Sequence, residues 1–304
     1  MHANRQAAPP EAVTLRAPAK VNLTLEVIER LANGFHRIRS IMMKLDHLAD
    51  AIRVQVDARG SGSGSGIVIH GDPARIPLDE TNLCHRAARA YLARTNKAAR
   101  IEIAIEKAIP VAAGLGGGSS DAAAVLRALN AHFHRALSPE ALAALGAEIG
   151  KDLPFFLQDS PLARISGMGE RVVGIAAMPR LNCLLVNPGI AVPTAEAYAA
   201  LRRELWFMDV PARVDRSAAM ASALAANDMN AIVAAFYNDF ELVAERAHPV
   251  LKEVKQALLA FGARGALMSG SGPTLFGLFD AEPALANAEA ALRARYPGFV
   301  VAHA

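Results

Sequence analysis

A glycine- and serine-rich run between two apolar segments has the residue types of a phosphate-binding loop. Residues 114–121 read GLGGGSSD. Glycines let backbone N–H groups approach an oxyanion without an intervening Cβ, and a helix after the run would add roughly half a positive charge at its N-terminus. Ser119 and Ser120, two hydroxyls at the helix start, favour a phosphate with a metal ion over the alternative of a flexible connector.

The spacing of this run excludes two common phosphate loops. A Walker loop carries a lysine and then Ser or Thr after its last glycine, but the chain's only Gly-Lys pair, Gly150-Lys151, is followed by Asp152. The dinucleotide fingerprint G-x-G-x-x-G, counted from Gly114, needs a glycine where this chain has Ser119. The loop therefore belongs to another class.

Two further groups could take part in chemistry beside such a loop. Lys20 and Asn22 stand at the mouth of a predicted strand, directly after Pro18 ends the preceding one. Asp152 precedes the apolar run LPFFL. Each has a structural alternative, because a lysine can protect a solvated strand edge and an aspartate can cap a short helix.

The loop is predicted to lie between a strand and a helix. Ile101, Ile103 and Ile105 recur at the period of two that marks a half-buried strand. Residues 122–129 repeat apolar side chains at helical spacing, and the serines and aspartate before them are good N-cap residues. The unit is therefore strand, glycine loop, helix.

Local signals predict the other elements. Residues 13–29 read as two strand pieces around Pro18, and residues 40–57 as strand, turn and strand. The pair Asn33-Gly34 predicts a tight turn. The remaining predicted helices lie over 79–94 with Thr81 or Asn82 as cap, from Pro139 with Ser138 as cap, around Tyr198 and over 282–295. The remaining predicted strands lie over 184–186, within 266–279 and over 299–301.

The composition is that of an ordinary globular chain. Its 304 residues are 53% apolar and 20% charged, with a net charge of +3 and a pI near 9.0. This mild basic balance suits an anionic small molecule, and no basic tract interleaved with aromatics argues for nucleic acid. No apolar run reaches the roughly 18 residues that span a membrane, and no signal peptide is recognised. Two distant cysteines, Cys84 and Cys183, suggest a reducing compartment, so we expect a cytoplasmic protein.

The run PVAAGLGGGSSDAA, residues 110–123, resembles the ATP-binding signature of the GHMP kinases, named for galactokinase, homoserine, mevalonate and phosphomevalonate kinases. Its triple glycine and double serine are most similar to the branch that phosphorylates 4-diphosphocytidyl-2-C-methyl-D-erythritol. Further motifs similar to that branch occur in the right order, namely APAKVNL, GFH, GKDLPFF, NPGIAVPT, NDFE and SGSG. With the loop they cover nearly the whole chain from residue 13.

This resemblance implies an α+β, two-domain GHMP kinase fold. The N-terminal domain, over 13–175, would be an α/β domain like that of ribosomal protein S5. The C-terminal domain, over 176–304, would be a ferredoxin-like α+β domain. Residues 1–12 read as a disordered tail, and the GSGSGSG run of 60–66 as a mobile surface loop.

The implied activity is Mg²⁺-dependent transfer of the γ-phosphoryl group of ATP to the 2-hydroxyl of that cytidyl diphosphate substrate, a step of non-mevalonate isoprenoid synthesis. Lys20 and Asp152 are the implied catalytic residues: Asp152 would accept or orient the hydroxyl proton, and Lys20 would hold Asp152 ionised and offset developing charge. Ser119 or Ser120 would lie near Mg²⁺. The implied ATP-binding residues are Pro110, Val111, Ala112, Ala113, Gly114, Leu115, Gly116, Gly117, Gly118, Ser119, Ser120, Asn82 and Lys107.

The resemblance also implies how the acceptor is bound. The branch has D-G-Y-H where this chain has N-G-F-H, so Phe35 keeps the stacking face for cytosine but loses the hydroxyl. Tyr198 would supply a second face for the base. The implied substrate-binding residues are Asn22, Phe35, His36, Thr194, Tyr198, Gly270 and Gly272.

Two other functions stay open at this point. One is another GHMP kinase acting on a smaller alcohol, such as mevalonate or homoserine. The other is a catalytically silent binding protein on the same fold, although a silent relative would be free to lose Lys20 and Asp152. A homodimer is compatible with the sequence, which does not set the oligomeric state.

Overall fold

The computed structural model describes residues 12–57, 66–176, 181–205 and 215–303, with the backbone alone given for 202–205. The predicted tail of 1–12 and the predicted mobile loop of 60–66 therefore lie outside the described residues, apart from Ala12 and Gly66. The predicted domain boundary at residue 175 stays a prediction.

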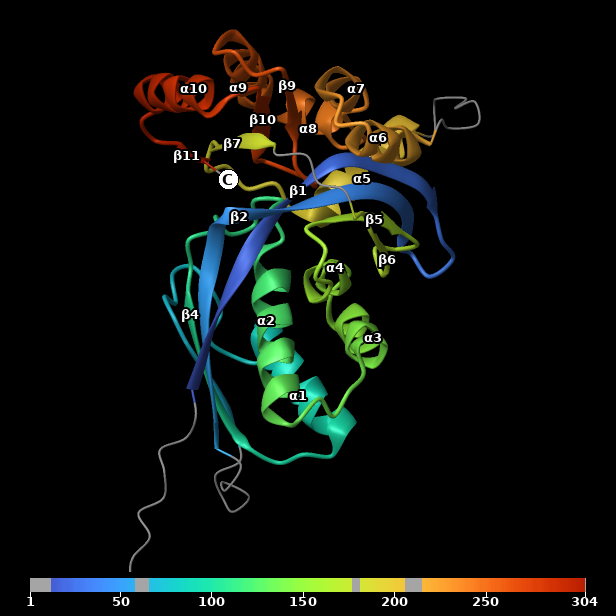
Figure 1. Ribbon diagram of the computed structural model, residues 1–304, viewed down its shortest axis with the longest axis vertical. Helices are drawn as coiled ribbons and strands as arrows, with labels where there is room; N and C mark the ends of the chain where they lie inside the picture. The colour runs from blue at the N-terminus through green and yellow to red at the C-terminus, as the bar shows by residue number, and fades with distance from the viewer. Residues whose placement is uncertain (1–11, 58–65, 177–180, 206–214, 304) are drawn as a thin grey trace, which may run out of the picture.

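Two long antiparallel strands run through both halves of the molecule (Figure 1). They are β1, Ala12–Arg30, and β2, His36–Asp57. A tight loop joins them, in which the N–H of Leu31 donates to the carbonyl of Phe35 over 2.8 Å and Gly34 has a φ of 85°. The turn predicted at Asn33-Gly34 is confirmed.

Both strands are continuous where the sequence predicted interruptions. The two strand pieces expected in 13–29 are one strand, and the turn expected within 40–57 is a bulge. Pro18 pairs with Ala49 and Ala19 with Leu45, so residues 46–48 bulge out opposite β1. Proline is tolerated at such a position because the regular ladder is already interrupted there. Pro18 therefore marks a bend of the sheet and not the end of a strand.

The larger sheet has the order β3-β4-β2-β1-β8, with β5 pairing β2 and β6 pairing β5. Helices α1 to α4 cover one face of it (Figure 1). The side chains between helices and sheet form a continuous apolar core. These elements are β3 Ile67–His70, α1 Leu83–Thr95, β4 Arg100–Glu106, α2 Gly117–His132, α3 Pro139–Ile149, α4 Leu153–Leu157, β5 Leu162–Ser166 and β6 Arg171–Gly174.

Two helix starts follow the capping residues expected from the sequence. Asn82 caps α1, and its side-chain oxygen accepts from the N–H of Cys84 over 2.8 Å. Ser138 caps α3, with Pro139 in the first turn, and its hydroxyl accepts from the N–H of Ala141. Each cap satisfies a backbone donor that has no partner inside its helix.

The smaller sheet has the order β11-β7-β10-β9. Its strand β10 reads LFGLF and is buried at every position, because α9 packs on this strand and core side chains fill the other face. The elements of this half are β7 Asn182–Asn187, α5 Thr194–Leu205, α6 Arg216–Ala225, α7 Met229–Ala234, β8 Tyr237–Asn238, α8 Glu241–Ala247, α9 Pro249–Ala260, β9 Gly265–Met268, β10 Leu275–Phe279, α10 Glu282–Arg295 and β11 Val300–His303.

The second half is tied to the first through β8, which pairs in parallel with β1 at Thr24 and Leu25. This pairing lies a few residues beyond Lys20 on β1, so both halves contact the strand that carries the lysine. Among the helices in the described ranges, none is long and apolar enough to cross a membrane.

Candidate active site

The glycine loop joins β4 to α2, and the helix begins earlier than predicted. Gly116, with a φ of 70°, is the N-cap residue, and α2 starts at Gly117. The expectation that a serine or Asp121 caps this helix is therefore wrong: the left-handed backbone that starts it is open to glycine at little cost. The first-turn N–H groups, which have no partners inside a helix, include those of Gly118 and Ser119.

A second glycine loop, between β9 and β10, packs against the first. A Cβ on Gly114 would collide with the carbonyl oxygen of Ser269, and a Cβ on Gly270 would lie 3.0 Å from the carbonyl oxygen of Gly114. The hydroxyl of Ser269 donates to the same carbonyl over 3.0 Å. Both loops therefore need glycine at the point of contact.

The two loops border a cavity of about 740 Å³. Most of the residues predicted for the site line it, and they come from β1, α5, the two glycine loops and the residues next to the ends of α1, β4 and α4. Four predicted residues do not line it, namely Ser120, Phe35, His36 and Gly272. The predicted residues that do are Lys20, Asn22, Asn82, Lys107, Pro110, Val111, Ala112, Ala113, Gly114, Leu115, Gly116, Gly117, Gly118, Ser119, Asp152, Thr194, Tyr198 and Gly270.

Lys20 is buried at the inner end of this cavity, on β1. Its ammonium donates to Oδ1 of Asn22 over 2.6 Å and to the carbonyl of Gly114 over 2.9 Å. Burial lowers the pKa of Lys20, and the nearby charge of Asp152 opposes that shift. Asn22 is itself held by donating to the hydroxyl of Ser40 over 2.8 Å. Lys20 thus reaches the glycine loop from a rigid strand.

Asp152 stands opposite Lys20, with 3.8 Å between its Oδ2 and the lysine Nζ. It is the N-cap residue of α4, but its side chain makes no capping hydrogen bond. The structural alternative of a capping aspartate therefore does not account for it. The side chain is 30% exposed, against 4% for Lys20, so the carboxylate is the member of the pair that a substrate can reach.

Lys107 is engaged by two buried carboxylates. Its Nζ donates to Oδ2 of Asp121 over 2.8 Å and to the carboxylate of Asp50. Burial acts to lower the pKa of Lys107, but the two carboxylates raise it above its ordinary value. Burial, and then the charge of Asp50, raises the pKa of Asp121. No local sequence pattern indicated this triad, because Asp50 on β2, Lys107 after β4 and Asp121 on α2 meet only through the packing of these elements.

Asn82 lines the cavity but uses its amide in the fold. Its Oδ1 caps α1, and its Nδ2 donates to the carbonyl of Pro77 over 2.7 Å. Its predicted contact with the nucleotide stays a prediction. The same holds for Lys107.

The two candidate metal serines differ in position. Ser119 lines the cavity, whereas Ser120 is buried and its hydroxyl has no hydrogen-bond partner within the described residues. Ser119 is therefore the serine that a phosphate-bound ion can reach. Its role as a ligand stays a prediction.

The predicted acceptor residues are arranged differently from expectation. The ring of His36 stacks on Tyr198, with centroids 4.5 Å apart, and Tyr198 packs edge-on against Phe240. Phe35 is 53% exposed and its ring faces the ammonium of Lys151, not the cavity. The stacked partner of Tyr198 is thus His36, and the predicted contacts of Phe35 and Tyr198 with the cytosine base stay predictions. Burial, followed by the charge of Asp152, raises the pKa of Tyr198 to about 12.

The motif NDFE holds the second glycine loop in place. Nδ2 of Asn238 donates to the carbonyls of Met268 and Gly270 over 2.7 and 2.8 Å, and Glu241 accepts from the N–H of Met268. At the cavity wall, the hydroxyls of Thr194 and Ser271 lie 3.0 Å apart. Ser271 also lines the cavity, and the sequence analysis missed it although it lies within the motif SGSG.

Sequence profiles of one kinase family match a segment in each half of the chain. The profile of the GHMP kinases N terminal domain matches residues 82–159. The profile of the GHMP kinases C terminal matches residues 220–298.

Curated relatives match almost the entire chain. A 4-diphosphocytidyl-2-C-methyl-D-erythritol kinase of Geobacter metallireducens is 41% identical over 293 residues, which are 96% of this chain and 98% of the relative. A protein of the same name from Shouchella clausii is 41% identical over 269 residues, which are 88% of this chain and 86% of the relative.

Two crystal structures share the fold. That of a 4-(cytidine 5'-diphospho)-2C-methyl-D-erythritol kinase has a TM-score of 0.75 at 37% identity and covers 96% of this chain and 98% of its own. That of homoserine kinase from Cytophaga hutchinsonii has a TM-score of 0.74 at 19% identity, covering 98% and 95%, which is a likeness of fold alone. The predicted α+β fold class is confirmed, and the chain belongs to the GHMP kinase family.

Proposed function

We propose that the protein transfers the γ-phosphoryl group of ATP to the 2-hydroxyl of 4-diphosphocytidyl-2-C-methyl-D-erythritol, giving the 2-phosphate, in the non-mevalonate route to isoprenoids. The observation that carries this proposal is the pair of Lys20 and Asp152, 3.8 Å apart beside the glycine loop. Relatives that are 41% identical over most of the chain bear the name of this kinase, which supports the choice of acceptor.

The donor phosphates lie, in this proposal, at the start of α2. The N–H groups of Gly117, Gly118 and Ser119 bind phosphate oxygens together with the positive end of the helix. The walls formed by Asn82 and Lys107 flank the nucleoside. Phosphoryl transfer asks a protein mainly for positioning and for neutralisation of charge, and this arrangement supplies both.

The chemistry falls to Asp152 and Lys20. Asp152 accepts the proton of the 2-hydroxyl while that oxygen bonds to the γ-phosphorus, and the bond from the γ-phosphorus to the bridging oxygen breaks to release ADP. The ammonium of Lys20 keeps Asp152 ionised and offsets charge on the transferring group. The hydrogen bonds of Lys20 to Asn22 and Gly114 fix it in place during the transfer.

The donor set around the cavity fits Mg²⁺ bound chiefly through substrate phosphates. No group of three or more His, Cys, Asp or Glu side chains that could hold a metal occurs in the part of the chain that the structure describes. Mg²⁺ in kinases uses one or two protein ligands with phosphate oxygens and water. The hydroxyl of Ser119 lines the cavity and would serve. Bound there, the ion would neutralise phosphate charge.

The cytidyl group is assigned to the wall that carries Tyr198 and Thr194. A base can stack on Tyr198 in the place that the His36 ring occupies, once that ring is displaced. The backbone of Gly270 gives the acceptor close access to the glycine loop. Both cysteines are free and buried, which fits the reducing cytoplasm to which we assign the enzyme.

The test is ATP consumption by the purified protein with and without the cytidyl substrate. We expect turnover that requires 4-diphosphocytidyl-2-C-methyl-D-erythritol, with the phosphate recovered on the 2-hydroxyl by ³¹P NMR. Mevalonate and homoserine are the matched controls. Faster turnover of either would contradict the assignment of the acceptor, and ATP binding without turnover of any alcohol would mark a silent binding protein.

A further inference from the structure

Helix α4, which carries Asp152 at its start, is too short to hold its own orientation. It has five residues, and isolated helices of this length are unstable in water. The position of Asp152 against Lys20 therefore depends on what contacts the ends of α4.

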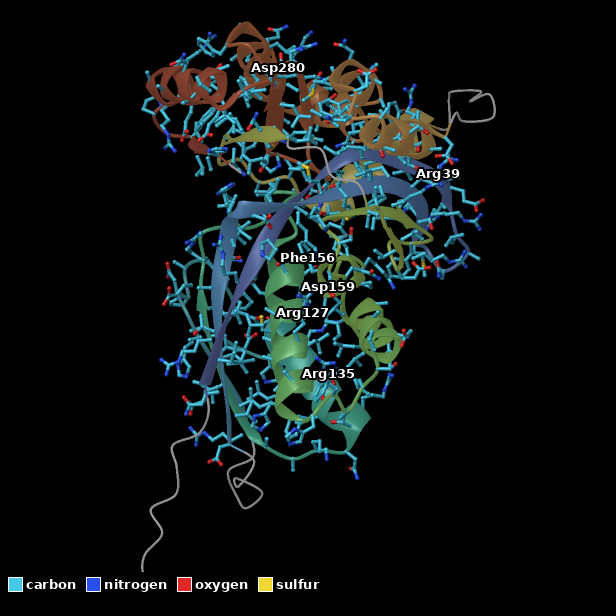
Figure 2. All side chains as sticks on the ribbon, viewed as in Figure 1. Arg39, Arg127, Arg135, Phe156, Asp159 and Asp280 are labelled. Atoms are coloured by element: carbon cyan, nitrogen blue, oxygen red, sulfur yellow. The ribbon has the colours of Figure 1, made fainter. Side chains whose placement is uncertain are left out.

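The C-terminal end of α4 is held by two cations. The ammonium of Lys44, on β2, donates to the carbonyl of Gln158, the C-cap residue. Arg127, on α2, donates to the carbonyls of Phe156 and Gln158 over 2.9 and 3.0 Å. Figure 2 shows Arg127, Phe156 and Asp159 together between α2 and α4. Carbonyls at a helix end have no partners inside the helix and carry negative charge, so cations bind them well.

The two lysines that contact the ends of α4 are cross-strand neighbours. Lys20 pairs with Lys44 in the register of β1 and β2. Directly opposed residues of an antiparallel pair project from the same face of the sheet. One ammonium therefore faces the carboxylate at the start of α4, and the other binds the carbonyl at its end.

Arg127 links the same helix to the phosphate loop. It projects from α2, whose first turn follows Gly116. Its two hydrogen bonds therefore fix α4 relative to the helix that begins at the loop. With Lys44, it ties three parts of the site together: the strand of Lys20, the loop helix and the helix of Asp152.

A contribution to the stability of the fold does not by itself explain why Lys44 and Arg127 lie together at the end of α4. Lys44 is buried, and its ammonium lies 5.4 Å from the centre of the Phe155 ring. Burial, and then the charge of Arg127, lowers the pKa of Lys44 to about 8, against the opposing effects of Asp159 and Asp46. A buried lysine beside an arginine is costly to charge, and an apolar residue of similar length would avoid that cost.

We propose that Lys44 and Arg127 are positioning residues that hold α4 so that Asp152 meets the acceptor hydroxyl. This inference rests on the proposed function, and it adds two residues that act on the reaction only through Asp152. A small displacement of a catalytic group is enough for a large loss of rate, because proton acceptance requires the carboxylate within hydrogen-bond reach.

The first experiment measures kcat and KM of Lys44→Met and Arg127→Met. We expect kcat to fall about tenfold to a hundredfold while KM for ATP stays within about twofold, because the phosphate loop is untouched. Arg127→Lys keeps the charge and one donor, and should lie between Arg127→Met and the wild type. Arg94→Met removes an exposed pair with Glu148 and serves as the matched control with unchanged kcat. Unchanged kcat in both Lys44→Met and Arg127→Met would overturn the proposal.

The second experiment repeats Lys44→Met in an Asp152→Asn background. If Lys44 acts through Asp152, its removal changes the residual rate by less than about twofold. An equal loss in both backgrounds would assign Lys44 a purely structural role and overturn the proposal. Hydrogen exchange of the amides in 153–158 should speed up in Lys44→Met. This measurement tests whether Lys44 holds α4 in place, and it does not depend on activity. It therefore still tests the proposal if the wild type fails to phosphorylate the cytidyl substrate and the proposed function itself is wrong.

Discussion

Two buried lysines flank the glycine loop, and their surroundings differ sharply. Lys20 faces one carboxylate at 3.8 Å, and burial lowers its pKa. Lys107 contacts two carboxylates, those of Asp50 and Asp121, and its pKa is raised. Two successive glycines of the loop each lie close to one of these lysines. A Cβ on Gly116 would lie 3.1 Å from Cγ of Lys20, and a Cβ on Gly117 would lie 3.1 Å from Nζ of Lys107.

The difference indicates that the charges of the two lysines have different roles. Lys107 is fully neutralised, so its charge serves the fold that supports the loop. Lys20 has one carboxylate partner, Asp152 at 3.8 Å, which makes no hydrogen bond to it, so in the proposed function its charge also serves the reacting groups. Under the proposed function, the same residue type, similarly buried, acts on the reacting groups on one side of the loop and supports the fold on the other.

Replacing Lys20 should have the largest effect on catalysis. Lys20→Met is expected to lower kcat by about 10²–10³-fold, because the transferring charge loses its stabilising cation. The unfolding free energy should stay near that of the wild type, since a buried cation without a close partner contributes little to it. Steady-state kinetics with urea unfolding measures both. A kcat near that of the wild type would contradict the proposed difference in role between Lys20 and Lys107.

Replacing Lys107 should act mainly on stability. Lys107→Met leaves the carboxylates of Asp50 and Asp121 buried without their cation, at an expected cost of about 3–5 kcal/mol in the free energy of unfolding. The kcat of the folded fraction should fall far less than in Lys20→Met. If the protein keeps its stability but its KM for ATP rises more than tenfold, Lys107 is instead a direct nucleotide ligand.

A pH titration of stability should isolate Asp121. Its pKa is raised in the folded state to about 7, so the folded protein binds more protons than the unfolded chain between about pH 4 and 7. Stability is lost as the pH rises through that window. Asp121→Asn removes the titration, and should be more stable than the wild type by about 1–2 kcal/mol at pH 8 but not at pH 4.

Guanidinium unfolding of both proteins at pH 4, 6 and 8 measures this difference. Asp159→Asn is a suitable control because that carboxylate is fully exposed. If the unfolding free energies of Asp121→Asn and the wild type change in parallel with pH, the pKa of Asp121 is not raised in the folded state.

Replacing Gly116 or Gly117 should have the smallest effects, and the effect at Gly116 should be the larger of the two. Gly116→Ala places a Cβ on a left-handed residue, 3.0 Å from the Phe156 ring and close to Lys20, so we expect kcat to fall about tenfold or less. Gly117→Ala lies in the first turn of α2, where alanine favours the helix. It meets the flexible end of Lys107, so its effect should be smaller. Kinetics and melting of both variants measure the order, and the reverse order would contradict the assignment of Lys20.

Local sequence signals were enough to predict much of the secondary structure. Asn82 and Ser138 cap helices where their types predicted, and the predicted helix over 282–295 is α10 to the residue. These features depend on neighbours in the chain. By contrast, the continuity of β1 through Pro18 depends on the bulge at 46–48 of its partner strand, which no local pattern reports.

The site was predictable to the extent that its residues lie in motifs. Lys20 and Asp152 were named, and the structure brings them together. The carboxylates around Lys107 and the cations around α4 were missed, because each contact joins elements that are far apart in sequence and carries no recurring spacing. Phe35 and Tyr198 were expected to offer two faces to the cytosine base; in the structure His36 stacks on Tyr198, and the contacts with the base stay predictions.

The parallel pairing of β8 with β1 has a consequence for how the chain is made. Leu25 and Val27 join a core with Leu184 and Phe240, and Asp239 accepts from the N–H of Val27 over 2.6 Å. A ribosome adds ~5–20 residues per second, so roughly 10–40 s separate the synthesis of this edge from that of its partner. During that interval the edge near Lys20 is unpaired and open to chaperones or to other nascent chains. The strand that carries Lys20 is thus synthesised well before β8, and its edge is completed only when β8 pairs with it.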